Sequence, residues 1–229
     1  MDPNEHWLLD SVIEQRHQIA LLTMDNVEAI FDRPKHGMDR DGVIATLNRL
    51  FSLGLLSAFN EERGEFSPTP EEVVAALDSE LDADYGLTAM GGAVWAEVAV
   101  PDWDRYVDGV FGDSDAEGEF DSIARERVGE FLCADKEYLQ KFMDSIQYRG
   151  IVLHKPSLKW DTVSPWQALY WKELPSAHRV RFVGMFVPEC PEDKIPEEYR
   201  GMGKWHLDSV ERAGCTPEDV TKTQDTPLA

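Results

Sequence analysis

The acidic stretch GDSDAEGEFDS at residues 112–122 has much of the spacing of a calcium-binding loop. Counted from Asp113, acidic side chains occupy positions one, three, five, seven and nine, and Gly118 occupies position six. An EF-hand loop presents oxygen ligands at these positions and closes its coordination sphere with a bidentate glutamate at position twelve. Here position twelve is Ala124. Without that closing carboxylate, we expect no specific calcium site and interpret the stretch as an exposed acidic linker.

Residue types suited to nucleophilic, redox or metal chemistry are scattered along the chain. The cysteines Cys133, Cys190 and Cys215 form neither a disulfide framework nor a CxxC metal motif. His6 and His17 would share a face of one continuous helix, but no carboxylate or cysteine obviously joins them. No phosphate-loop, hydrolase or zinc-protease motif occurs. The sequence therefore predicts no cofactor and no bound metal, and it favours an interaction protein over an enzyme.

Charge is the most unusual property of this sequence. The formal net charge is -22, and residues 54–135 alone contain 4 Lys+Arg against 21 Asp+Glu. Such a field repels nucleic acid and anionic membranes and attracts basic proteins. A surface that serves only solubility is the alternative. We predict a basic protein partner. The predicted partner-binding residues are Asp113, Asp115, Glu117, Glu119 and Asp121.

The first hundred or so residues combine helical periodicity with a hairpin pattern. Apolar spacing predicts helices at 7–22 and 24–32, and a third that begins after Asp39 and ends at Gly54. Two short strands, LLSAF and EFSPT, flank the turn EERG. A helix that begins at Pro70, the strand YGLT and the helix GGAVWAEVAV follow.

Three helices that lead into the hairpin at LFSLGLLSAF, with the later YGLTAMGGAVWAEV, resemble a winged helix-turn-helix domain. The resemblance covers roughly residues 1–100 and implies a DNA-reading third helix, whose exposed face offers Arg40 and Arg49. The hairpin tip NEERGE has three glutamates against one arginine, so it would repel the phosphate backbone. A winged-helix transcription regulator is therefore the alternative function, and nucleic acid is disfavoured as a partner.

The residue pattern of the sequence changes at Gly150. Before this glycine, apolar spacing predicts helices; after it, β-branched and aromatic residues predict strands. The segment SPWQALYWKEL, at 164–174, opens with the serine and proline of a helix start. The predicted helices of this part are 101–111, 122–133, 136–146 and 164–174, and the predicted strands are 150–154, 158–163 and 178–187.

We therefore predict an α+β fold, with a mainly helical, winged-helix-like N-terminal region packed with a smaller α+β C-terminal region. The expected divisions are a winged-helix-like domain at 1–100, a helical connector with the acidic loop at 101–148 and an α+β region at 149–229.

The expected function is that of a non-enzymatic, cytoplasmic protein-interaction module that resembles immunity proteins or nucleic-acid mimics in its acidic surface. The N-terminus lacks the basic and apolar segments of a signal peptide, and no apolar run approaches the ~18 residues of a membrane span. Few, widely spaced cysteines fit a reducing compartment. The sequence carries no signal for the oligomeric state.

Overall fold

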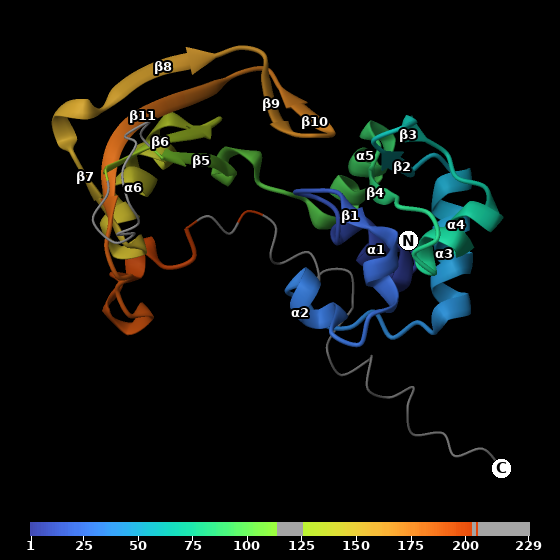
Figure 1. The fold of residues 1–229 in the computed structure, drawn as a ribbon. Coiled ribbons are helices and arrows are strands. Elements are labelled where there is room, and N and C mark those ends of the chain that lie inside the picture. Colours follow the sequence, from blue (N-terminus) through green and yellow to red (C-terminus); the bar gives the residue numbers. More distant parts are fainter. Residues whose placement is uncertain (114–125, 203–204, 206–229) are drawn as a thin grey trace. The chain divides into compact units, whose positions relative to one another are not determined.

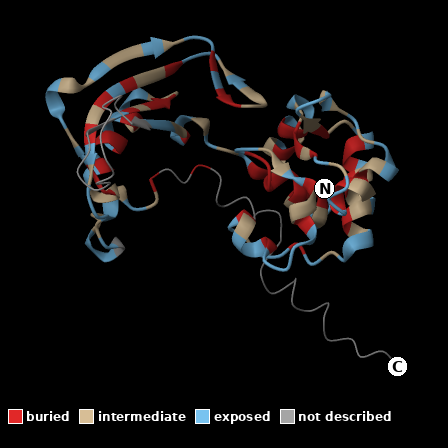
Figure 2. Cartoon of the chain, viewed as in Figure 1, coloured by how far each residue is buried: buried red, intermediate tan, exposed pale blue. Residues whose placement is uncertain are grey.

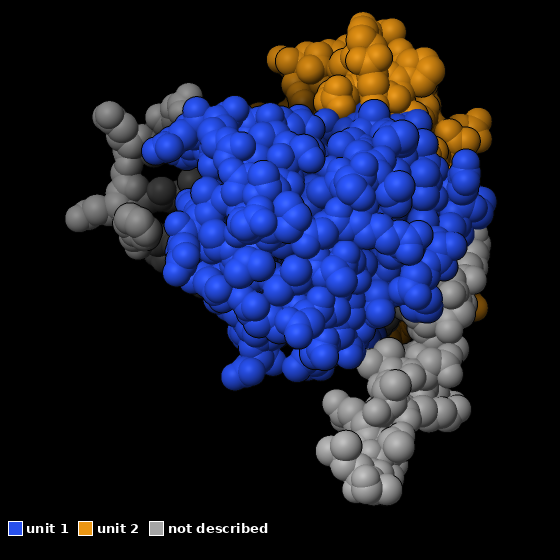
Figure 3. All heavy atoms as spheres, turned by 90° about the vertical axis from the view of Figure 1, so that its right-hand side faces the viewer, with its two compact units in different colours: residues 1–100, 169–172, 207–229 blue, residues 101–168, 173–206 orange. Residues whose placement is uncertain are grey.

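The computed structural model describes residues 1–113, 126–202 and 205, and these divide into two units. The N-terminal unit contains residues 1–100 together with 169–172, and the C-terminal unit contains 101–168 and 173–206 (Figure 3). Each unit has its own sheet and its own core.

Most helices of the N-terminal unit begin at residues whose side chains satisfy free backbone N–H groups. Asp2 and Thr69 each form a capping box with the glutamate three residues later, and Asp39 accepts a hydrogen bond from the backbone N of Gly42. Gly54, at φ +66, follows the end of α3 in the left-handed conformation that glycine adopts most readily. The helices are α1 (Pro3–Asp10), α2 (Val27–Phe31), α3 (Arg40–Ser52), α4 (Pro70–Leu77) and α5 (Ala89–Ala99), with a 3₁₀ turn η1 (Ile19–Thr23).

A four-stranded antiparallel sheet accompanies these helices. Its strands lie in the order β1-β4-β2-β3, so the hairpin β2–β3 is extended by the later strand β4 (Figure 1). Tyr85 and Leu87 of β4 share one face and are buried in the core, and Asp84, which is partly buried, lies on the other face with Gly86. The strands are β1 (His17–Gln18), β2 (Leu56–Asn60), β3 (Gly64–Phe66) and β4 (Asp84–Leu87).

The core of the N-terminal unit lies between the sheet and the helices. Leu8 and Leu9 of α1, Leu47 of α3 and Trp95 of α5 have no exposed surface. Figure 2 shows buried residues in red along the inner sides of these elements. Burial of such side chains is the largest favourable contribution to the folding free energy.

The C-terminal unit is built on a five-stranded antiparallel sheet. Its order is β5-β6-β11-β7, and β8 also pairs with β11, the long strand that is orange in Figure 1. The helix α6 (Lys136–Ser145) buries Leu139, Phe142 and Met143 against Phe131 and Phe182 of the sheet. The strands are β5 (Val107–Asp113), β6 (Glu126–Cys133), β7 (Ile151–Leu153), β8 (Lys159–Val163) and β11 (Ala177–Phe186).

Shorter elements complete this part of the chain. Strands β9 (Trp166–Leu169) and β10 (Lys172–Leu174) form a hairpin whose turn, residues 169–172, belongs to the N-terminal unit. The 3₁₀ turns are η2 (Trp103–Arg105), η3 (Ile146–Arg149), η4 (Lys155–Ser157), η5 (Glu192–Lys194) and η6 (Glu197–Tyr199).

The predicted fold class is wrong. The N-terminal region is not mainly helical, because its helices share the unit with a four-stranded sheet, and the C-terminal half is rich in β-structure. Two segments predicted as helices, 101–111 and 122–133, contribute strands β5 and β6 instead of a helical connector. A third, 164–174, forms the hairpin β9–β10, and the Ser164 hydroxyl donates to the carbonyl of Pro175 instead of capping a helix.

The first predicted helix is too long. Helix α1 ends at Asp10, and the chain then forms β1 and η1 within the predicted range 7–22. His6 and His17 therefore do not share a helix. Within the described residues, no helix has the length and apolar character needed to cross a bilayer.

Candidate functional site

The predicted acidic loop lies mostly outside the described residues. Asp113 is the last residue of β5 and pairs in register with Arg127 of β6. Asp115, Glu117, Glu119 and Asp121 fall in the range 114–125, which the structure does not describe. The predictions of a partner surface and of no calcium site at this loop therefore stay predictions.

The two arginines of the DNA-binding alternative are both near carboxylates of the same chain. Arg40, the first residue of α3, forms an ion pair of 2.7 Å with the exposed Asp78. Arg49 approaches Glu5 of α1, with 3.0 Å between Nε and Oε1. A nucleic-acid phosphate would have to compete with these carboxylates for each guanidinium.

An acidic hollow of about 510 Å³ lies at one end of the four-stranded sheet. We use the name "acidic hollow" for the depression whose lining consists of Gln18, Phe59, Asn60, Glu61, Glu62, Glu80, Leu81, Asp82 and Asp84. Five of these residues are carboxylic acids, and none of the residues that line the hollow is a lysine, arginine or histidine.

Strand pairing assembles the hollow from three distant segments. Asp84, the first residue of β4, pairs with Gln18 of β1 on one side and with Phe59 of β2 on the other. Alternation along β4 places Tyr85 in the core, so Asp84 faces away from it. The β2–β3 turn and the loop between α4 and β4 then add the exposed carboxylates Glu61, Glu62, Glu80 and Asp82.

Negative charge in the hollow is only weakly compensated. Partial burial, and then the neighbouring Asp82, raise the pKa of Asp84, while His17 and Arg16 oppose this shift. The Gln18 amide donates to Asp82 Oδ1 at 3.3 Å, which supplies a dipole but no charge. The ionised form of Asp84 is therefore less favourable than that of a fully exposed aspartate.

The two arginines near the hollow, Arg16 and Arg63, contact aromatic rings, and each forms an ion pair with a carboxylate that does not line the hollow. The Arg16 guanidinium lies over the Phe59 ring at 4.9 Å and the Tyr170 ring at 5.0 Å, and it is 3.8 Å from Glu65. Arg63 pairs with Glu72 at 2.5 Å and stacks on Phe66. The hollow thus keeps its acidic character although two arginines lie in the neighbouring segments.

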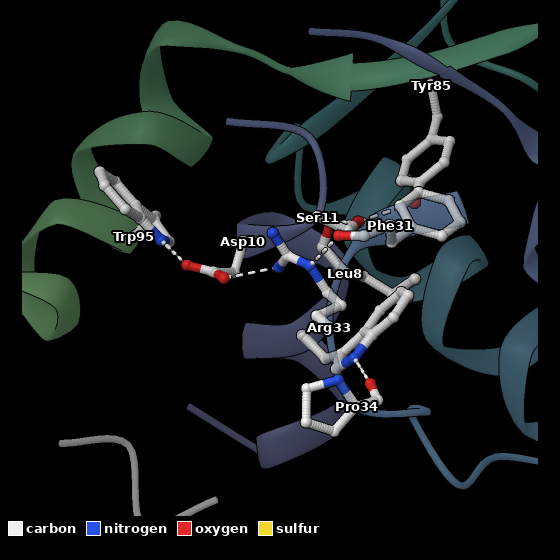
Figure 4. Close-up of polar contacts among 9 residues, drawn as sticks. Leu8, Asp10, Ser11, Phe31, Arg33, Pro34, Tyr85 and Trp95 are labelled. Carbon is white, nitrogen blue, oxygen red and sulfur yellow. Dashed lines mark hydrogen bonds and ion pairs between the residues drawn. The ribbon is translucent and has the colours of Figure 1, made fainter. Parts of the chain in front are cut away.

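A buried polar network holds the N-terminal unit together (Figure 4). Asp10 accepts from Arg33 Nη1 at 2.6 Å and from Trp95 Nε1 at 2.8 Å, which joins α1 to α5 and to the segment after α2. The Ser11 and Tyr85 hydroxyls lie 2.8 Å apart, and burial raises the pKa of Tyr85. Removing one partner from a buried ion pair typically costs about 3–5 kcal/mol. These contacts satisfy the buried groups, so we assign the network a structural role.

Cys133 and His17, two further residues of reactive types, contact neighbouring groups of the chain. Cys133 is fully buried, its thiol donates to the carbonyl of Asp104 at 3.2 Å, and burial raises its pKa to about 11. The His17 ring contacts Phe31 edge-on at 4.7 Å. No group of three or more His, Cys, Asp or Glu side chains in the described ranges could hold a metal ion.

The acidic hollow was not among the predicted sites. The sequence predicts NEERGE as an acidic hairpin tip, and it predicts that DSEL at 78–81 ends the helix that begins at Pro70; Asp82 and Asp84 follow that helix. Only the pairing of β2 with β4 brings these two acidic segments together. Alternation of Asp84 and Gly86 with Tyr85 and Leu87 was the signal that places Asp84 on the outer face.

Comparisons with protein-family models, with curated proteins and with solved structures found no match.

Proposed function

We propose that this protein is an interaction module, not an enzyme, and that its acidic hollow binds a lysine or arginine side chain of a basic protein. The observation that carries the proposal is the hollow itself, whose lining contains the partly buried Asp84 and four further carboxylic acids but no lysine, arginine or histidine. Weakly compensated carboxylates at a partly desolvated position are stabilised by an incoming ammonium or guanidinium group.

The apolar residues of the hollow suit the stem of such a side chain. Phe59 and Leu81 are part of the lining, and each is partly buried. Lysine and arginine stems pack on apolar surface while their charged ends reach polar groups. The exposed carboxylates at the rim also steer a basic partner toward the hollow and so raise the association rate.

A basic protein partner is favoured over DNA by the same residues. Arg40 and Arg49 each have a carboxylate of this chain nearby, and the turn of the β2–β3 hairpin contributes Glu61 and Glu62 to the acidic hollow. An acidic face of this kind occupies a cationic cleft as phosphates do, in the manner of immunity proteins and nucleic-acid mimics. We place the protein in the cytoplasm, since Cys133 and Cys190 are free thiols.

Affinity capture with two matched variants tests the proposal. The hollow variant carries Glu61→Gln, Glu62→Gln, Glu80→Gln and Asp82→Asn. The control variant makes the same change in charge at four exposed acids elsewhere in the N-terminal unit, through Glu14→Gln, Asp25→Asn, Glu28→Gln and Asp32→Asn.

Each protein is used to capture partners from a lysate of the source organism, followed by mass spectrometry. We expect a basic protein to be retained by the wild type and the control variant and lost by the hollow variant. If both variants lose the partner equally, or if neither variant loses it, the result would count against the hollow as the binding site.

A further inference from the structure

A second hollow, in the C-terminal unit, has the opposite chemistry. Its volume is about 600 Å³, within the range of small-molecule sites. It lies between the end of α6 with η3 and the segment that contains η5 and η6. We call it the arginine pocket; the residues of its lining that matter here are Tyr148, Arg149, Glu189, Cys190, Tyr199 and Arg200.

Two arginines give this pocket its charge. The Arg149 guanidinium donates to the carbonyl of Met202 and lies 5.1 Å from the Phe142 ring centre. Arg200 donates to the carbonyls of Ile195 and Asp193 at 2.9 and 3.1 Å. Neither arginine forms an ion pair with a carboxylate in the described part of the chain.

These contacts orient both guanidinium groups without neutralising them. A carbonyl oxygen fixes a donor but leaves the positive charge uncompensated. Glu189 is the single carboxylate of the lining, so the pocket has a formal charge of the opposite sign to the chain as a whole. A pre-oriented pair of guanidiniums is suited to a phosphate or carboxylate group.

Two aromatic rings line the same pocket. Tyr148 comes from η3 and Tyr199 from η6, and their ring centres are 5.7 Å apart at a tilt of 32°. Tyr199 packs against the core cluster that contains Leu139 and Phe182, which holds its ring in place. A flat ring of a ligand can stack or pack edge-on against such side chains.

We propose that the arginine pocket binds a small organic anion in which a flat ring is joined to a phosphate or carboxylate group. Arg149 and Arg200 bind the anionic group, and Tyr148 and Tyr199 contact the ring. This site is independent of the proposed function, because its residues and the charge of its ligand differ from those of the acidic hollow.

Cys190 offers a direct reporter of occupancy. Its thiol is free and partly exposed on the wall of the pocket, whereas Cys133 is fully buried. In a full-length chain with Cys215→Ser, the rate of Cys190 labelling by the neutral reagent dithiodipyridine is measured with and without phenyl phosphate, benzoate or adenosine monophosphate. Inorganic phosphate and uncharged adenosine serve as the ring-free and charge-free probes.

We expect at least one of the three ring-bearing anions to slow labelling saturably at up to about 10 mM, and phosphate and adenosine to have little effect. Arg200→Gln should raise the half-protecting concentration about tenfold, because a charge-assisted hydrogen bond is lost. Arg149→Lys should raise it too, since lysine lacks the planar fork.

The matched control is Arg105→Gln, which removes an exposed arginine that lies over the Tyr138 ring outside the pocket. Arg105→Gln should leave the half-protecting concentration unchanged. Without ligand, all variants should show the same rate of Cys190 labelling if the segment around Cys190 keeps its conformation. The proposal is overturned if none of the three anions slows Cys190 labelling, or if inorganic phosphate slows it as much as the ring-bearing anions do. It is also overturned if Arg200→Gln and Arg149→Lys both have the half-protecting concentration of the parent chain.

Discussion

His36 shows how burial and hydrogen bonds favour one protonation state of a side chain. Its Nδ1 accepts from the backbone N of Met38 at 3.0 Å, so the proton of the neutral ring lies on Nε2, which donates to the carbonyl of Leu22 at 2.9 Å. Burial lowers the pKa of His36 below its ordinary value of 6.5, against a smaller opposing effect of the Leu22 carbonyl. The folded protein therefore favours the neutral ring.

The expected consequence is a loss of stability in mild acid. As the pH falls below 6.5, the unfolded chain binds a proton at this position before the folded chain does. The stability that neutral His36 contributes is thus complete above that pH and is lost as the pH falls through the folded pKa. His36→Gln keeps a side-chain N–H donor but does not titrate, so its urea midpoint should fall less between about pH 7.5 and pH 5.5.

The same substitution at the exposed His154 serves as the control for the loss of a histidine. If His36→Gln and the wild type show the same pH dependence, His36 is not held neutral by the fold.

At the scale of elements, residues 169–172 of the N-terminal unit contact the segment that follows α1 and the strand β4. The Tyr170 hydroxyl donates to the carbonyl of Val12 at 2.6 Å and accepts from the backbone N of Leu87 at 2.5 Å. Trp171 Nε1 donates to the carbonyl of Ile13 at 2.8 Å. A Cβ atom on Gly92 would lie 2.0 Å from the Trp171 ring, so only glycine fits there. Residues 169–172 thus bind the segment that follows α1.

We therefore expect Tyr170→Phe to lower the free energy of unfolding of the N-terminal unit by about 1–3 kcal/mol, since two backbone groups lose their partner. Tyr148→Phe is the control, because no hydrogen bond of its hydroxyl occurs within the described residues. Urea unfolding measures both. Equal stabilities of the two variants would show that the Tyr170 hydroxyl does not hold this turn.

Elements with local signals could be predicted from the sequence, and elements that depend on distant pairing could not. Asp39 and Gly54 bracket α3, and Pro70 begins α4, because caps and helix-compatible residues act within a few positions. In β6, Val128, Phe131 and Leu132 have helical spacing, but eight residues of β11 pair with this strand and decide its conformation. The segment 164–174, predicted as a helix from the serine and proline at its start, likewise forms the hairpin β9–β10.

The site was less predictable than the fold for the same reason. The excess of acid could be read from composition, and the hairpin tip with Glu61 and Glu62 was identified as acidic. That Asp82 and Asp84 lie beside that tip follows from the β2–β4 register, which joins residues 25 positions apart, Phe59 and Asp84. Register of this kind is set by packing of the whole sheet.

For the whole molecule, the central question is whether the location of the acidic residues or the total charge of the chain determines binding. A net charge of -22 attracts any polycation at low salt, so weak binding of a basic protein would by itself prove little. Exposed charges also contribute little to stability, so neutralising several of them should leave the fold intact. Variants that lose equal charge at different places separate the two explanations.

The most direct measurement is the anisotropy of a labelled peptide of about ten residues, half of them lysine, titrated with full-length protein at ionic strengths from about 10 mM to 0.5 M. The samples are the wild type, the hollow variant, the control variant and a loop variant with Asp113→Asn, Asp115→Asn, Glu117→Gln and Glu119→Gln. We predict that at low salt the hollow variant binds about tenfold more weakly than the control variant, and that the difference disappears at high salt. Equal affinities of the hollow and control variants, or a loss confined to the loop variant, would contradict the assignment of the acidic hollow as the partner site.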